Sequence, residues 1–98
     1  MGIEENKVES YLKQRVEFYG GMCLKLTGLK GILDRLVLLP NKPVIFCELK
    51  TLQGVISPAQ LIVASRLRKA GFTAEFAFCK DDVDQILARA MEDVENAE

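Results

Sequence analysis

Residues 31–50, GILDRLVLLPNKPVIFCELK, encode two strands joined by a turn, and this stretch decides the fold. Residues 34–39 and 44–51 are rich in β-branched and large apolar side chains, which favour strands. The sequence PNKP at residues 40–43 is a strong turn signal, because proline fixes φ and asparagine tolerates left-handed backbone. We therefore predict a hairpin of two antiparallel strands.

Three charged side chains interrupt these apolar strands: Asp34, Glu48 and Lys50. Alternate strand residues point to the same face, so Glu48 and Lys50 should emerge side by side while Cys47 and Leu49 face the core. A carboxylate and an amine in an apolar strand destabilise a fold unless they are paired or bind a ligand. This favours a functional site, and the alternative is a cross-strand ion pair at the surface.

The length of the turn decides which face Asp34 occupies. With a four-residue loop that pairs Leu39 with Val44, Asp34 would share the face of the core residues. A five-residue loop, or a bulge near Asp34, returns it to the face of Glu48. Only the second arrangement brings the two carboxylates together.

The rest of the chain supplies three helices and two strands. Apolar residues at steps of three and four predict a helix over residues 3–19, ended by glycines at 20–21: Val8, Leu12, Val16 and Tyr19. We expect a strand over 22–26, a glycine-containing loop over 27–31, and a helix from a Ser57–Gln60 capping box to about residue 70. A strand over 72–79 and a helix capped by Asp81 and running to about residue 94 complete an αβββαβα order.

Composition restricts both the fold class and the chemistry. With 98 residues, 49% of them hydrophobic and 28% charged, the chain should form one α/β domain over residues 1–98 with a real core. Neither a membrane span nor a signal peptide is expected, so we predict an intracellular protein. Histidine is absent, which excludes Ser-His and Cys-His catalysis and His-containing zinc sites. Any metal site must therefore use oxygen ligands, which suit Mg²⁺, Mn²⁺ or Ca²⁺.

The three cysteines, Cys23, Cys47 and Cys79, lack CxxC spacing and lie in apolar segments, so we expect plain buried thiols. Charge is unevenly distributed, although the total is only −1. Residues 18–74 contain eight basic and two acidic residues, and residues 81–98 contain seven acidic residues and one arginine. A basic segment with two isolated carboxylates suits a polyanion-binding surface that carries a metal site, and the alternative is a scattered solvated surface.

On the first helix, Glu9 and Glu5 border the buried stripe, at about 60° and 20° from Leu12 at 100° per residue. Glu5 also suits a first helical turn, where the helix dipole favours an acid, whereas Glu9 lies too deep in the helix for that explanation. Which of the two serves a site is left open.

Asp34, the Glu48-Leu49-Lys50 triplet, Gln60 and a preceding Glu9 resemble the motifs of the PD-(D/E)xK nuclease superfamily, in the order that the superfamily has them. More narrowly, the chain is similar to the VRR-NUC domain, the virus-type replication-repair nuclease, over most of its length. Leu33 departs from the pattern, because the family usually has proline before the aspartate. The resemblance implies a restriction-endonuclease-like αβββαβ core, with a mixed sheet flanked by helices.

Residue by residue, the resemblance implies that Asp34 and Glu48 are ligands of Mg²⁺ or Mn²⁺, with the Leu49 carbonyl as a third. Lys50 would orient or deprotonate the attacking water, and Glu9 would hold a second cation or a water on the metal. Gln60 is placed in the site as well, although the capping box explains it equally well.

We assign contacts with nucleic-acid phosphates to Lys25, Lys30 and Arg35, and ordinary surface side chains are the alternative. The resemblance implies a phosphodiester hydrolase, specifically a homodimeric DNA endonuclease selective for branched DNA such as four-way junctions. It also implies a phage or bacterial protein that acts in the cytoplasm. The alternatives are a nicking or flap-type repair nuclease, and a non-catalytic nucleic-acid-binding module with a nuclease fold.

Overall fold

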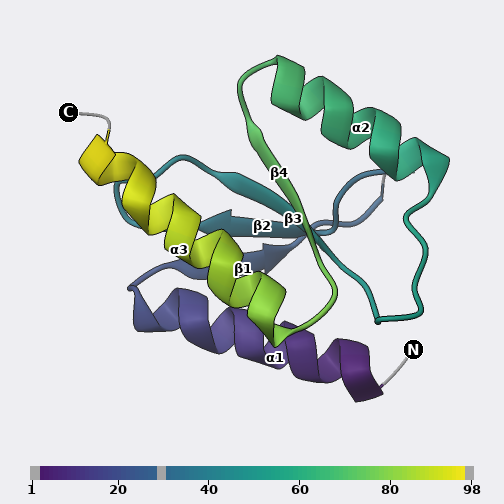
Figure 1. The fold of residues 1–98 in the computed structure, drawn as a ribbon, viewed down its shortest axis with the longest axis horizontal. Helices are drawn as coiled ribbons and strands as arrows, with labels where there is room; N and C mark the ends of the chain where they lie inside the picture. Colours follow the sequence, from purple (N-terminus) through teal and green to yellow (C-terminus); the bar gives the residue numbers. More distant parts are fainter. Residues whose placement is uncertain (1–2, 29–30, 97–98) are drawn as a thin grey trace.

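The computed structural model describes residues 3–28 and 31–96, with side chains over residues 7–28 and 31–92. The predicted order of elements is confirmed (Figure 1). In chain order these are α1 (Ile3–Phe18), β1 (Met22–Lys25), β2 (Arg35–Leu38), β3 (Ile45–Leu49), α2 (Pro58–Lys69), β4 (Thr73–Ala77) and α3 (Lys80–Asn96). No helix in the described part of the chain is long and apolar enough to cross a membrane.

The four strands form one mixed sheet in the order β1-β2-β3-β4. The first three strands are antiparallel neighbours, and β4 runs parallel to β3. Parallel neighbours need a crossover connection, and α2 provides it here. The mixed sheet flanked by helices is therefore as predicted.

The hairpin of β2 and β3 has the register that brings the carboxylates together. Val37 pairs with Ile45, so residues 39–43 form a five-residue connection. One further step along the same register places Asp34 opposite Glu48, on the same face of the sheet. The five-residue alternative from the sequence is thus confirmed, and no bulge is needed.

The helices cover the two faces of the sheet unequally. Figure 1 shows α1 and α3 lying beside each other, with α2 apart from them. The larger core lies between these two helices and the sheet, and its fully buried members include Leu12, Val16, Val37, Cys47 and Leu87. A smaller cluster of Leu33, Ala64 and Ala74 packs beneath α2 on the other face.

The helix ends follow the predicted capping with one correction. The capping box of α2 is confirmed, with Ser57 Oγ accepting from the Gln60 N–H and Gln60 Oε1 accepting from the Ser57 N–H. Asp81 is not the cap of α3, because this helix already begins at Lys80. Instead the Asp82 carboxylate reaches back and accepts a 2.8 Å hydrogen bond from the Phe78 N–H.

The three cysteines are free thiols, of which Cys47 is fully buried and Cys23 and Cys79 are half-buried. Burial raises the pKa of the Cys47 thiol to about 12. A thiol in this state is a weak nucleophile, so Cys47 serves as a small apolar core residue.

Candidate active site

Two carboxylates from neighbouring strands meet at one end of the sheet. Glu48 belongs to β3, and its side chain is only 8% exposed. Asp34 immediately precedes β2, and its backbone N–H donates a 3.1 Å hydrogen bond to Glu48 Oε1. The hairpin register therefore fixes the two residues next to each other before any ligand is present.

Lys50 completes this group from the end of β3. Its Nζ lies 3.5 Å from Glu48 Oε2, and its side chain is mostly buried. The Lys50 N–H donates to the carbonyl of Ala77, so the parallel pairing with β4 holds the backbone at this point. Cys47 and Leu49 point to the opposite face and are buried in the larger core, as the strand alternation predicts.

The surroundings of Asp34 disfavour its charge. Its Oδ1 atom is buried and has no hydrogen-bond partner among the residues that the structure describes. Burial, followed by the negative charge of Glu48, raises the pKa of Asp34, although Arg35 and Lys25 act in the opposite direction. A buried carboxylate oxygen without a partner is costly, and a bound cation would relieve the cost.

Arg35 occupies a different place from the one predicted. Its side chain is 5% exposed and lies on the α1 side of the sheet, where it bridges two carboxylates. Its Nη2 atom is 2.8 Å from Glu9 Oε2, and its Nη1 atom is 3.0 Å from Asp34 Oδ2 and 3.2 Å from the Asp34 carbonyl oxygen. In this structure the Arg35 guanidinium is therefore buried and ion-paired, and is not presented to a nucleic-acid phosphate at the surface as the sequence suggested.

The role of Arg35 was missed in the sequence, although a signal for it exists. Arg35 and Val37 are two positions apart in one strand, so they share a face. Because Val37 belongs to the core, the alternation that places Glu48 also places Arg35 inside. A buried arginine requires acidic partners, and Glu9 on α1 is the acid that borders the buried stripe.

The loop before Asp34 is held in place from two sides. Gly31 has φ of +81°, and a Cβ atom at this position would lie 3.1 Å from the backbone and Cβ of Ala59 in the first turn of α2. Leu33, which departs from the motif that the sequence resembles, is fully buried against Ala64 beneath α2. The apolar anchor at Leu33 and the close approach at Gly31 together position Asp34.

The remaining predicted residues are placed as follows. Gln60 lies in the first turn of α2 and uses its side-chain oxygen for the capping box. Lys25, at the end of β1, is exposed and pairs in register with Arg35. Lys30 and the side chain of Glu5 lie outside the described residues.

The donor set fits a magnesium-type cation. In the described part of the chain, no three acidic or cysteine side chains stand close enough together to hold a metal ion. Mg²⁺, however, is usually bound through one or two carboxylates, with waters and substrate phosphates completing the shell. Asp34 and Glu48 supply those two carboxylates, and the unpartnered Asp34 Oδ1 is a free oxygen donor.

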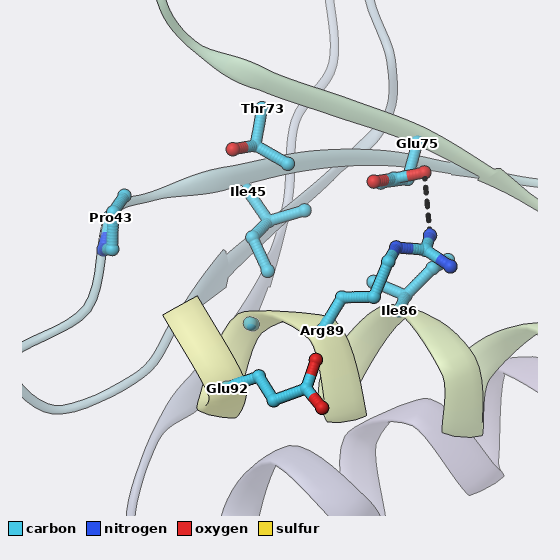
Figure 2. A pocket seen from close by; sticks show the side chains of 8 residues that line it. Pro43, Ile45, Thr73, Glu75, Ile86, Arg89 and Glu92 are labelled. Carbon is cyan, nitrogen blue, oxygen red and sulfur yellow. Dashed lines mark ion pairs between the residues drawn. The ribbon is translucent and has the colours of Figure 1, made fainter. Parts of the chain in front are cut away.

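A pocket of about 320 Å³ lies at the opposite end of β3, between the start of β4 and the middle turns of α3 (Figure 2). Glu75 and Arg89 form a 3.2 Å ion pair across it. None of the predicted site residues lines this pocket. This pocket is therefore separate from the two carboxylates.

Comparison with known proteins identifies the fold and the family. No family model matches the chain. The protein "Putative nuclease p44" of Acyrthosiphon pisum secondary endosymbiont phage 1 is 38% identical over 71 residues, which cover 70% of this chain and 76% of that protein. A solved structure described as "VRR_NUC domain" matches with a TM-score of 0.81 and 32% identity, over 89% of this chain and 97% of that one.

A second structure, "VRR_NUC domain protein", shares the fold at 16% identity, with a TM-score of 0.72 over 94% of this chain and 91% of that one. The common fold, and the identity that extends over nearly all of the first structure, make this chain a member of the VRR-NUC family of nucleases.

Proposed function

We propose that this nuclease is a DNA endonuclease that hydrolyses phosphodiester bonds with the help of Mg²⁺ or Mn²⁺. One observation carries the proposal. The Asp34 backbone N–H donates a hydrogen bond to the Glu48 carboxylate, so the two acids are neighbours, while Asp34 Oδ1 stays buried without a partner in the described part of the chain. Lys50 contacts the same glutamate, so an amine lies beside the two carboxylates. This combination suits the hydrolysis of a negatively charged ester.

Asp34 and Glu48 would hold the cation, with the Leu49 carbonyl as a further oxygen donor. Such a cation supplies Lewis-acid stabilisation of the phosphate and a lower pKa for a water molecule. Lys50 orients or deprotonates the attacking water and balances the charge on the phosphate in the transition state. Its contact with Glu48 Oε2 fixes the amine beside the cation ligands.

Gln60 and the basic residues would act on the DNA backbone. The side-chain oxygen of Gln60 is used by the capping box, which leaves its amide nitrogen as a donor to substrate. Lys25 is exposed near Asp34 and would contact a backbone phosphate, as would Lys30. These contacts carry no base information, so recognition would depend on the shape of the DNA.

The substrate we propose is branched DNA such as a four-way junction, cut by a symmetric homodimer. One chain has one such site, and two strands at a junction need two sites related by symmetry. Exposed apolar side chains offer a surface for a second copy: Val55, Leu61 and Ile62 just before and within α2, and Leu52, which lies beside Lys7 and Val8 of α1. The phage relative supports action inside a bacterial cell.

Cleavage of labelled linear, flap and four-way-junction DNA, with Mg²⁺ and with EDTA, tests this function. We expect incision of the junction in Mg²⁺ and none in EDTA. Preferred incision of the flap would contradict the junction preference and support the nicking or flap-type repair nuclease. Binding of all three DNAs without incision in either Mg²⁺ or Mn²⁺ would refute the enzyme and leave a nucleic-acid-binding module.

A further inference from the structure

The guanidinium of Arg35 lies between the carboxylates of Glu9 and Asp34. It makes three contacts of 2.8 to 3.2 Å, two with carboxylate oxygens and one with the Asp34 carbonyl. Because the Arg35 side chain is 5% exposed, its charge has little water to stabilise it and depends on these partners. Arginine keeps its charge under all ordinary conditions, so this pairing persists over the working range of pH.

The pairing leaves the two carboxylate oxygens of Asp34 in different surroundings. Oδ2 belongs to Arg35, and Oδ1 is buried without a partner among the described residues. Glu48 accepts from the Asp34 backbone through Oε1 and lies 3.5 Å from Lys50 through Oε2. The free oxygen of Asp34 and the carboxylate of Glu48 therefore form one place for a divalent ion.

A second divalent ion would need Glu9 as a ligand, as the sequence resemblance suggests. Glu9 Oε2 is already 2.8 Å from Arg35 Nη2, and Asp34 Oδ2 is engaged by the same guanidinium. A cation bridging these oxygens would displace Arg35 and leave its buried charge unpaired beside a dication. Both consequences are unfavourable.

We propose that Arg35 takes the place of a second divalent cation, so that each chain binds one metal ion, at Asp34 and Glu48. Arg35 is then a positioning residue that orients Asp34, and Glu9 acts through Arg35 and not as a metal ligand. This inference rests on the proposed metal-dependent function. In this arrangement the fixed charge of Arg35 neutralises the carboxylates of Glu9 and Asp34, which a second metal ion would otherwise do.

The number of Mn²⁺ ions bound per chain tests the inference without DNA and without activity. Free Mn²⁺ is measured by electron paramagnetic resonance while the protein is titrated with Mn²⁺ alone. We expect one site in the wild type, and also in Arg35→Lys, which keeps the charge. Arg35→Met should bind two ions, because Glu9 and Asp34 Oδ2 become available, and adding Glu9→Gln to that variant should return the count to one.

Two sites in the wild type, or a single site in a folded Arg35→Met variant, would overturn the inference. If circular dichroism shows that Arg35→Met does not fold, the Mn²⁺ affinity of the Glu9→Gln variant tests the inference instead. This substitution should leave Mn²⁺ affinity within about threefold, whereas loss of a true ligand costs at least about tenfold. Glu48→Gln should abolish Mn²⁺ binding. If the wild type binds no Mn²⁺, or if Glu48→Gln binds as much Mn²⁺ as the wild type, the metal-dependent function itself is refuted.

Discussion

Asp34 has two carboxylate oxygens in different surroundings. One is held by Arg35, and the other is buried without a partner among the described residues. Burial and the nearby charge of Glu48 raise the pKa of Asp34, so the ionised acid is unfavourable in the metal-free protein. A carboxylic acid with a raised pKa is typical of functional sites, where residues that bind a ligand often reduce the stability of the fold.

Asp34→Asn should therefore stabilise the metal-free protein at neutral pH. A raised pKa means that the folded state holds the proton more tightly than the unfolded chain. The stabilisation from Asp34 is then complete below the unfolded pKa and is lost as pH rises through the folded pKa. The amide resembles the protonated acid, so we expect a higher melting temperature in EDTA. A variant that melts below the wild type in EDTA would contradict this account of the site.

Lys50→Ala should stop cleavage while preserving the fold and most DNA affinity. The substitution removes transition-state stabilisation but few phosphate contacts, so we expect the cleavage rate to fall by about 10²- to 10⁴-fold. Single-turnover cleavage and fluorescence anisotropy measure the two effects separately. Lys69→Ala, at the exposed end of α2, is the matched control. Equal rates for Lys50→Ala and this control would exclude Lys50 from the chemistry.

At the scale of elements, the β2–β3 hairpin carries the site, and its length was the open question in the sequence. The strands, the turn and the α2 capping box follow from alternation, proline and helix-start signals, so these elements were predictable. The choice between a four- and a five-residue connection was not, because PNKP permits both. The structure pairs Val37 with Ile45, and this register puts Asp34 beside Glu48.

Strand alternation signals the burial of Arg35, but its pairing with Glu9 is harder to predict. It links β2 to α1, and local patterns carry no information on which helix face meets which strand. Asp81 was misplaced because a helix start is uncertain by a residue or two when several acids follow one another. Glu48, Lys50 and Asp34 could be found because charges in apolar strands stand out in any register.

Ser57→Ala tests whether the capping box sets the stability of α2. The substitution removes the acceptor for the Gln60 N–H, and we expect the free energy of unfolding to fall by about 1 kcal/mol. Denaturant titration measures the change. Ser65→Ala, an exposed position within the same helix, should change stability by less than about 0.5 kcal/mol. A Ser57 variant as stable as the Ser65 variant would refute the capping contribution.

At the scale of the whole molecule, the described helices leave apolar side chains exposed in the loop between β3 and α2. Leu52 is 65% exposed and Val55 is 81% exposed, so neither packs beneath α2 in the same chain. Ile56, the next residue after Val55, is half-buried. Exposed apolar groups in this number are typical of surfaces that meet a partner.

Val55→Glu should therefore dissociate the proposed dimer without unfolding it. Light scattering should give about twice the monomer mass for the wild type and the monomer mass for the variant, with unchanged circular dichroism. Phe18→Ser, at an exposed apolar position at the end of α1, should remain dimeric. A wild type that is monomeric at micromolar concentration and cuts all duplexes equally would refute the dimer and the junction preference, but not the nuclease.

The central claim is that Asp34 and Glu48 hold the cation with which this nuclease cuts DNA. Its most direct test is the rate of incision of a labelled four-way junction in Mg²⁺, compared for the wild type and Glu48→Gln. Glu48→Gln keeps an oxygen for the Asp34 N–H but removes the charge that binds the cation. We predict incision by the wild type, none in EDTA, and a fall of at least about 10³-fold for the variant. A Glu48→Gln protein that cuts at the wild-type rate would contradict the account.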